Sequence, residues 1–541
     1  MVYRLTRSAL VLTVLTVLAA LAPVPTAAQG LAVGDPMEDY LRVLQVAGLA
    51  DGPSLMVRPL RVAGPTAVPG ATHPWAATLP APASDSAAPG LGARLDPAEL
   101  RVSGNSSLPF GHNDGAQWQG KGLNLALDAG ATARWGALRL SVHPTLIAAQ
   151  NLAFPLAPVD RPGAGAFAYP WRQIDLPQRP GPDAQVRLDP GQSVASATWG
   201  SAVAGFGTQN LWWGPGREHS ILIGNNAPGF PHAFLASARP VDVRIGTLEG
   251  QWIWGRLQES GWYLEEDAGQ GRFVTGAVVV YSPSFLAGLS LGGGRIFVTD
   301  VPPEGLGVAD YLSIFQPGSK QRLRTPENPT GNDYSDQMAS FLARWVLPAS
   351  GFEVYGEWAR NDHFGDFRDL MLEPDHSQGY TLGFHKVEAL SGTRLLSFGG
   401  ELTHLEQSKT LLVRSTPKFY AHHYVLRGYT QRGQVIGAAL GPGGNGGSLR
   451  ADLFTPAGRL GVYVARQAHD NDAFYGRAGT PTELPHWPDV SLAGGARALV
   501  FARGLEIGFD AALTYTMNRN FTPAEDVWNV HGGVSARWRP R

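Results

Sequence analysis

Short and long connections alternate along this 541-residue chain, and no other feature constrains its fold as strongly. Segments of about ten residues with strand character are separated by tight turns near residues 130–136, 200, 249–250, 282–284, 348–351, 391–392, 456–458 and 503–504. Longer irregular stretches lie between them at residues 150–183, 212–240, 260–270, 299–335, 361–377, 406–445, 469–489 and 518–527. In an up-and-down barrel every second connection lies at the same end, so this alternation places the short turns at one end and the long loops at the other.

The last strand shows the side-chain pattern of a membrane barrel most clearly. Val530, Gly532, Val534, Ala536 and Trp538 alternate with His531, Gly533, Ser535 and Arg537. One face is apolar and the other is small or polar, as in a strand that faces lipid on one side and a lumen on the other. Residues 290–297 and 505–515 show the same tendency. We therefore expect an all-β fold, a transmembrane antiparallel β-barrel of about 18 strands over residues 99–541.

The first 28 residues have the pattern of a secretory signal peptide. Arg4 and Arg7 precede an apolar run from Ala9 to Ala22, and Thr26-Ala27-Ala28 forms a small-x-small cleavage site before Gln29. A membrane anchor fits less well because the run is shorter than the roughly 20 residues that a helical span needs. No later segment approaches a transmembrane helix, so a membrane location requires a barrel. The sequence predicts export to the outer membrane.

Residues 29–98 are expected to form a short helix and a Pro/Ala-rich segment on the periplasmic side. Asp35 can cap the helix, Pro36 fits its first position, Glu38 completes a capping box and Gly48 ends it. Residues 51–97 are rich in Pro, Ala and Gly, which predicts an extended linker or a loosely packed periplasmic segment.

Composition excludes several kinds of partner and site. A formal net charge of −2 provides no field for nucleic acid, and the absence of cysteine excludes disulfides and thiolate metal sites. Asp375-His376-Ser377 are adjacent and cannot assemble a hydrolase triad. His422 and His423 would point to opposite faces of a strand and cannot together hold a metal ion. We expect no catalytic residue, no metal and no cofactor.

The segment Trp212–Pro228 is the most unusual stretch of the chain. It combines the paired rings of Trp212 and Trp213 with Arg217, Asn225 and Asn226. Flat aromatic faces stack on sugar C–H surfaces, while Arg and Asn donate hydrogen bonds to acidic groups and hydroxyls. The alternative is a loop that folds back and braces the lumen with its polar groups satisfying one another. Composition alone favours this structural interpretation, because polar networks inside barrels are usually structural.

At these residues the chain resembles the Wzi-type capsule assembly proteins. The resemblance is carried by Trp212–Pro228 and, in the matching order, by Gly294-Arg295 with Phe297, Gly331-Asn332-Asp333 through Phe341, Glu353–Glu357, and Gly428-Tyr429 with Gly433–Gly437. It departs from the family pattern where Pro228 follows Ala227 directly, in the reduced helical region, and in a terminal aromatic, Trp538, three positions before the end. The resemblance implies an 18-stranded outer-membrane barrel with periplasmic helices, and our strand count is not independent of it.

The resemblance also implies a lectin that retains capsular or extracellular polysaccharide on the cell surface and catalyses no reaction. The long outer loops supply further candidate contacts, which are Tyr169, Trp171, Arg172, Tyr420, Tyr475 and Trp487. Expected partners are the polysaccharide and outer-membrane lipid, with a polysaccharide export complex left open, and the barrel is expected to be monomeric. A porin-like transport channel is the alternative function, and a soluble secreted β-protein is a third.

Overall fold

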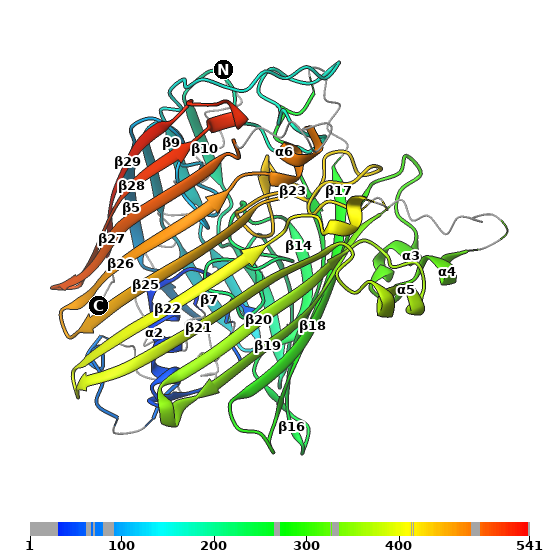
Figure 1. The fold of residues 1–541 in the computed structure, drawn as a ribbon. Coiled ribbons are helices and arrows are strands. Elements are labelled where there is room, and N and C mark those ends of the chain that lie inside the picture. Colours follow the sequence, from blue (N-terminus) through cyan, green and yellow to red (C-terminus); the bar gives the residue numbers. More distant parts are fainter. Residues whose placement is uncertain are drawn as a thin grey trace.

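The strands of the computed structural model form one closed antiparallel barrel (Figure 1). The structure describes residues 31–60, 66–68, 71–78, 91–264, 271–324, 326, 335–412, 414, 416–477 and 487–538. The ring closes where β29 (Val527–Trp538) pairs with β5 (Ala98–Asn105), with Val534 opposite Val102. The predicted fold class is confirmed, and the predicted signal peptide lies outside the described residues.

The barrel wall is divided into many strand segments. In chain order they are β4 (Leu91–Leu95), β5, β6 (Gly122–Asp128), β7 (Ala131–Trp135), β8 (Leu138–Val142), β9 (Thr145–Ala149), β10 (Gln185–Asp189), β11 (Val194–Trp199), β12 (Ala202–Gly207), β14 (His232–Ser237), β15 (Val241–Asp242), β16 (Gly246–Leu257), β17 (Arg272–Pro283), β18 (Leu289–Asp300), β19 (Asp336–Leu347), β20 (Phe352–Asn361), β21 (Gln378–Ser391), β22 (Arg394–His404), β25 (Asn445–Thr455), β26 (Gly458–Ala468), β27 (Val490–Ala502), β28 (Leu505–Met517) and β29. Several segments are parts of one bent strand, as where only Ala129 and Gly130 separate β6 from β7. The number of about 18 strands therefore stays a prediction.

Short elements lie in the connections. They are the strands β1 (Ala50–Asp51), β2 (Val57–Arg58), β3 (Thr66–Ala67), β13 (Trp212–Trp213), β23 (Thr430–Gln431) and β24 (Gln434–Val435), the α-helices α2 (Pro36–Val46), α3 (Val308–Tyr311), α4 (Lys320–Leu323), α5 (Phe367–Leu372) and α6 (Asn471–Arg477), and the 3-10 helices η1 (Ser313–Phe315), η2 (Pro348–Ser350), η3 (Lys409–Leu412) and η5 (Arg519–Phe521). None of the helices in the described part of the chain is long and apolar enough to cross a membrane.

Side chains of the wall alternate between an apolar outer face and a polar inner face. In β29, Val530 and Val534 are exposed on the outside, whereas Asn529 and His531 are buried on the inside. This is the alternation predicted for the last strand. A continuous outer surface of exposed Leu, Val, Phe and Trp is stable against hydrocarbon and unfavourable in water, so the wall suits a lipid bilayer.

The two ends of the barrel differ in the length of their connections, as predicted. Tight turns join the wall strands at residues 136–137, 200–201, 243–245, 284–288, 348–351, 392–393, 456–457 and 503–504. The long loops lie at the opposite end, and they include residues 106–121, a connection that the sequence did not reveal. The turn expected at Glu249-Gly250 was wrong, because both residues lie inside β16, paired with Val280 and Val279. Short turns mark the periplasmic end of outer-membrane barrels.

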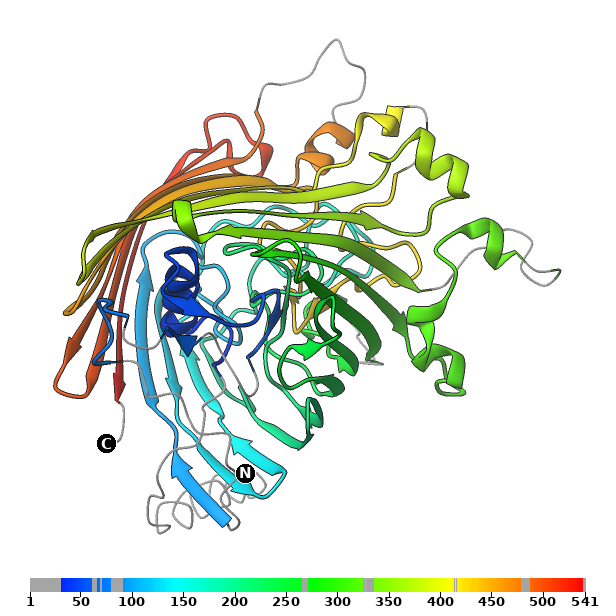
Figure 2. The same cartoon turned by 90° about the horizontal axis from the view of Figure 1, so that it is seen from below.

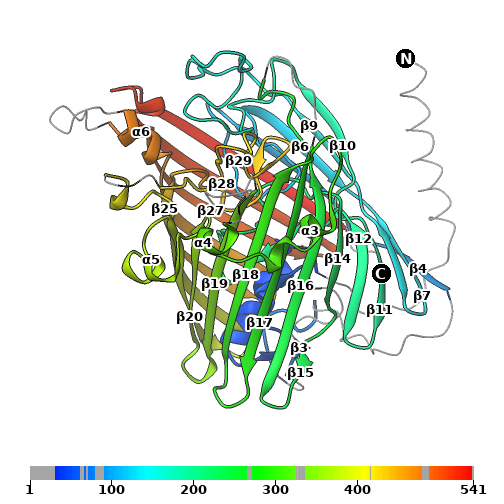
Figure 3. The same ribbon diagram turned by 90° about the vertical axis from the view of Figure 1, so that its right-hand side faces the viewer.

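The N-terminal segment lies inside the barrel at the short-turn end (Figures 2 and 3). The predicted helix is confirmed as α2, where Asp35 accepts the Met37 N–H at 2.8 Å and Pro36 is the first residue. Glu38 accepts the Gly34 N–H at 3.2 Å, whereas a capping box would have it accept the Asp35 N–H. An apolar cluster fixes the helix, joining its residues and Trp75 to the wall residues Val346, Val387, Leu395, Phe454 and Leu499.

The described parts of residues 51–97 are therefore not a loose linker. The ring of Tyr40 stacks on Trp75 with centroids 4.0 Å apart, and the Trp75 indole N–H donates to the Thr455 carbonyl oxygen at 3.1 Å. The wall also begins before residue 99, the predicted domain boundary, because β4 pairs with β7. The Pro/Ala-rich composition did not reveal this packing, in which Leu55, Met56, Leu60 and Trp75 are buried.

Candidate functional site

The segment Trp212–Pro228 folds back into the lumen, where it forms the centre of the largest apolar cluster. Its first residues, β13, pair with β2 of the N-terminal segment. Trp213 is fully buried, and its indole N–H donates to Gln251 Oε1 at 2.8 Å. Trp212 is 3% exposed, and the Arg58 guanidinium covers its ring at 4.5 Å. Neither ring keeps a free face on which a sugar could stack.

Arg217 and its neighbours bind protein carboxylates. The backbone N–H groups of Arg217 and His219 donate to the Glu401 carboxylate at 2.7 and 2.8 Å. The Arg217 guanidinium, 4% exposed, pairs with Asp39 of α2 at 2.5 Å. Burial lowers the pKa of His219 to about 4, so this imidazole is neutral at physiological pH.

The side chains of the two asparagines of the segment also donate hydrogen bonds to backbone carbonyl groups. Asn225 Nδ2 donates to the Asn113 carbonyl oxygen at 2.7 Å, and Asn226 Nδ2 donates to the Val435 carbonyl oxygen at 3.0 Å. Gln434 Nε2 donates in return to the Asn226 carbonyl oxygen at 2.8 Å. The structure thus brings the five predicted residues of this segment together as a brace across the lumen. Their bonds within the protein argue against the predicted contact with polysaccharide, which stays a prediction.

Two carboxylates, Asp39 and Glu353, hold α2 and the brace to the wall. Asp39 faces three arginines, Arg217, Arg459 at 3.2 Å and Arg450 at 3.5 Å. Burial raises the pKa of Asp39, but the positive charges of Arg217 and Arg459 outweigh it and hold this pKa well below its usual range. The second carboxylate, Glu353 of β20, is fully buried.

Glu353 receives one cation from the helix and one from the wall. Arg42 of α2 and Arg344 of β19 each lie 2.7 Å from one of its oxygens, and His385 lies at 3.3 Å. Because both guanidinium groups are almost fully buried, removing the carboxylate would leave two uncompensated charges. We call α2 together with the segment Trp212–Pro228 the lumenal plug.

The remaining candidates lie in the long loops at the other end of the barrel. The hydroxyl of Tyr169 donates to Asp470 Oδ2 at 2.8 Å, and Arg172 Nε donates to the same oxygen at 3.0 Å. Arg172 is buried, so it joins two loops and does not face solvent. Burial, followed by the negative charge of Asp470, raises the pKa of Tyr169. These residues support the outer surface without forming it.

An aromatic row connects three of the loops above this ion pair. Trp171 contacts Phe521 at a centroid distance of 5.2 Å, Phe521 contacts Phe474 at 5.5 Å, and Phe474 contacts Tyr475 at 5.1 Å. Phe474 is the buried member of the row, Trp171 and Phe521 are partly exposed, and Tyr475 is 55% exposed. We call Trp171, Phe474, Tyr475 and Phe521 the outer aromatic row.

Phe474 and Phe521 were not among the residues predicted from the sequence. Both lie in connections that were predicted as long loops, so an aromatic census of these loops would have found them. Trp487 lies in the same loop as Tyr475 and is 41% exposed. Two residues later, Asp489 accepts the Asn520 N–H at 2.8 Å. Tyr420 is fully buried and donates to the Ile221 carbonyl oxygen at 3.0 Å, so its expected role as an exposed contact was wrong.

Asp472 at the start of α6 lies below the aromatic row. Its Oδ1 accepts the Gln407 N–H at 2.8 Å. Burial raises the pKa of Asp472 to about 6, against the opposing effects of that hydrogen bond and of Arg172. In the described ranges, no group of three or more His, Cys, Asp or Glu side chains could hold a metal ion.

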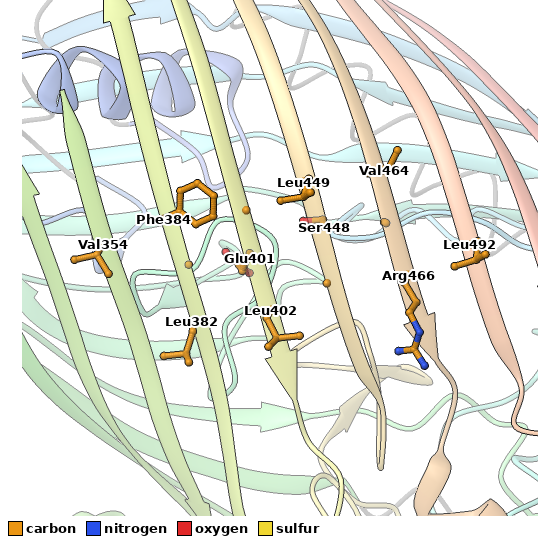
Figure 4. Close-up of a pocket in the computed structure, with 14 residues that line it drawn as sticks. Val354, Leu382, Phe384, Glu401, Leu402, Ser448, Leu449, Val464, Arg466 and Leu492 are labelled. Atoms are coloured by element: carbon orange, nitrogen blue, oxygen red, sulfur yellow. The ribbon is translucent and has the colours of Figure 1, made fainter. Parts of the chain in front are cut away.

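A groove of about 670 Å³ lies on the outside of the wall (Figure 4). Outward-facing side chains of β20–β22 and β25–β27 line it, among them Leu382, Leu402, Leu449, Val464 and Leu492. Gly400 leaves the space at its floor, since a Cβ atom there would lie 2.7 Å from Leu449 Cδ2. The lining is mostly apolar, with the exposed Arg466 at one side, and suits hydrocarbon chains.

The chain and its fold are similar to those of known proteins. The family model described as capsule assembly protein Wzi matches residues 96–497. The solved structure of Escherichia coli Wzi, described as an outer membrane protein involved in group 1 capsule assembly and a carbohydrate-binding β-barrel, superposes with a TM-score of 0.58 at 13% identity, covering 94% of this chain and 99% of that one. Acinetobacter baumannii OccAB2 gives a TM-score of 0.39 at 12% identity, with 82% of this chain and 98% of that chain covered. No curated protein matches the chain in sequence.

Proposed function

Because the chain belongs to the family of the capsule assembly protein Wzi, we propose that it binds capsular or extracellular polysaccharide and anchors it at the cell surface. The protein is an outer-membrane β-barrel. The observation that carries the proposal is the outer aromatic row at the long-loop end, where the exposed ring of Tyr475 and the partly exposed rings of Trp171 and Phe521 are linked through Phe474. In this account the protein holds the polymer and does not change it chemically.

The row suits a sugar polymer for two physical reasons. Aromatic faces stack on the C–H surfaces of sugar rings, and several rings in sequence engage several residues of a repetitive chain at once. The Tyr169–Arg172–Asp470 cluster orders the loop that carries Trp171, so less conformational entropy is lost on binding. We assign direct contacts to Trp171, Tyr475, Phe521 and Trp487, and a positioning role to Tyr169 and Arg172.

The lumenal plug supports this function against the alternative of a transport channel. In the lumen, Trp212–Pro228 contacts α2 through the Arg217–Asp39 ion pair. It also packs against the loop that carries Tyr420 and Tyr429, where the Tyr429 hydroxyl donates to the Leu222 carbonyl oxygen at 2.7 Å. A steady aqueous path needs a lumen lined by solvated groups, whereas these side chains are buried. A monomeric barrel that cooperates with a polysaccharide export complex is consistent with the proposal.

Deletion of the gene in an encapsulated host tests the proposed function. We expect the polymer to shift from the cell-bound fraction to the medium with its total amount unchanged, because attachment is lost and synthesis is not. Expression of the intact chain should restore attachment. If the deletion strain keeps its polysaccharide on the cell, or makes less polymer in total, the anchoring role is wrong.

A further inference from the structure

A long loop covers part of the outer wall that would otherwise face lipid. Arg295 of β18 points outward opposite Ala339 of β19, and its guanidinium contacts the side-chain oxygen of Gln337, two residues away on the same face of β19, at 2.7 Å. Its remaining donors reach the carbonyl oxygens of Ile314, at 3.2 Å, and Gln316. A cation on the outer wall of a barrel is costly in lipid, so the loop 301–324 supplies the acceptors that lipid lacks.

The same loop packs on the aromatic side chains of the wall. The Trp254 indole N–H donates to the Tyr311 carbonyl oxygen at 2.9 Å. The ring of Phe315 meets Trp252 edge-on at 5.6 Å, and the ring of Tyr311 meets Phe273 at 5.2 Å. The loop is therefore fixed against the outside of β16 and β17 and lies beside the barrel, as Figures 1 and 3 show for α3 and α4.

A second loop extends this structure. The backbone N–H of Lys320 donates to the Phe364 carbonyl oxygen at 2.8 Å, and Lys320 Nζ lies 3.1 Å from Asp362. The loop 362–377, which contains α5, is linked in turn to Arg414 by ion pairs with Asp369 and Glu373. The three loops thus form one body on one side of the barrel.

The exposed side chains of this body are mainly apolar and basic, with Glu304 as an acidic exception. The apolar ones are Val308, Leu312, Phe315, Phe367, Met371 and Leu372, exposed to between 43% and 76%. Arg322, Arg324 and Arg368 are exposed on the same two loops. We call this exposed surface the apolar ledge. Apolar side chains flanked by basic ones on short helices are the composition of segments that lie in a membrane interface.

We propose that the apolar ledge is embedded in the interface of the outer leaflet, with its apolar side chains among acyl chains and its arginines at anionic headgroups. Continuity with the lipid-facing wall supports this occupant. Gly293, two residues from Arg295 in β18, is paired with the exposed Val279 on one side and the exposed Phe341 on the other. The ledge therefore begins where the lipid-facing surface ends, and lipid that covers Val279 and Phe341 reaches it.

Site-specific fluorescence tests the proposal, and the absence of native cysteine makes single-cysteine labelling unambiguous. The variant Phe315→Cys carries a bimane dye and is folded into phosphatidylcholine–phosphatidylglycerol vesicles with brominated acyl chains. Val279→Cys is the lipid-facing control and Tyr475→Cys the water-facing control, both at exposed positions. We expect the dye at residue 315 to lose as much fluorescence to the brominated chains as the dye at residue 279, and to resist aqueous iodide.

Because Phe315 also packs on Trp252, Phe367→Cys provides a second reporter whose side chain is 68% exposed. Iodide quenching at 315 and 367 equal to that at 475 would overturn the proposal, since water would then cover the ledge. Protection from both quenchers would also overturn it, because a protein partner or a second copy would then be the occupant. Neither outcome bears on polysaccharide binding at the outer aromatic row.

Discussion

The lumenal plug and the outer aromatic row are built from the same residue types and differ in what surrounds them. Both combine tryptophan or tyrosine rings with arginines and acidic side chains. In the plug, Trp213 is fully buried and Arg217 is paired with Asp39. In the row, Tyr475 keeps 55% of its surface exposed above the Arg172–Asp470 pair. A ring can bind a sugar only where one face is free, so the same composition gives a structural brace in one place and a binding surface in the other.

The two regions also differ in how their charges are held. Asp39 and Glu353 are each surrounded by arginines inside a closed lumen, where removal of one partner leaves the others unpaired. The outer row depends mainly on ring contacts between loops, which are individually weak. Substitutions should therefore change stability in the plug and polysaccharide binding in the row.

The largest effect is expected for Trp213→Ala. The change removes a fully buried ring and leaves Gln251 without its donor, so it should cost about 3–5 kcal/mol for the cavity and about 1–3 kcal/mol for the lost hydrogen bond. Thermal unfolding in detergent measures this loss of stability, and Trp199→Ala, at an exposed position, is the matched control. An unchanged melting temperature, or a selective loss of polysaccharide binding by a fully stable variant, would contradict the structural role of this ring.

Asp39→Asn should loosen the plug by a somewhat smaller amount. Its carboxylate is a quarter exposed, so the loss should lie near the lower end of the about 3–5 kcal/mol typical of a broken buried ion pair. Transient conductance in planar bilayers is the measurement, because a displaced plug opens the lumen. Asp51→Asn, at an exposed position of the same segment, should remain as silent as the parent. Steady conductance by the unaltered protein would instead favour the channel.

Acidification should act in opposite directions on the two regions. Burial holds the pKa of His219 at about 4, below its value in an opened plug, so the opened plug takes up a proton first and the closed form loses stability as the pH falls from 7 to 5. Burial raises the pKa of Asp472 to about 6, so the folded loop takes up a proton first and gains stability as the pH falls through 6. Each change is on the order of 1–2 kcal/mol.

Hydrogen exchange at the two pH values, corrected for the intrinsic rate, separates these effects. Protection should decrease in residues 212–228 and increase in residues 469–477. His219→Gln should reduce the first change, to which the neighbouring His112 contributes because burial lowers its pKa to about 4 as well. Asp472→Asn should abolish the second change. Changes of the same sign in both regions would show that a global property of the barrel, and not these two buried groups, sets its response to acid.

The sequence predicted the barrel well because its signals are periodic. The alternation of β29 follows from the requirement that each strand face lipid on one side, and the alternating lengths of the connections follow from the up-and-down order of the strands. The turn misplaced at Glu249-Gly250 shows the limit of this reasoning, since Gly250 lies within a strand and the chain turns at residues 243–245. A glycine in a strand and a glycine in a turn are not distinguished by composition.

The candidate site was predicted less well because side-chain exposure is a property of the assembled barrel. The same segment that identified the family, Trp212–Pro228, is buried by α2, by Arg58 and by the loop of Tyr420, all of them distant in sequence. Its structural role could be stated as an alternative from composition, but only three-dimensional contacts decide between a brace and a binding loop. Trp171 and Tyr475 were identified from loop position alone, whereas their partners Phe474 and Phe521 were not.

The amount of polysaccharide retained on cells that carry Trp171→Ala together with Tyr475→Ala tests the central claim most directly. The variant replaces the protein in the deletion strain at an equal level of folded barrel, with Trp199→Ala as the control. Each lost ring contact should cost about 0.5–1.5 kcal/mol, so binding should weaken about tenfold and the polymer should appear in the medium while the melting temperature stays unchanged. Full retention of the polysaccharide by the double variant would contradict the assignment of binding to the outer aromatic row.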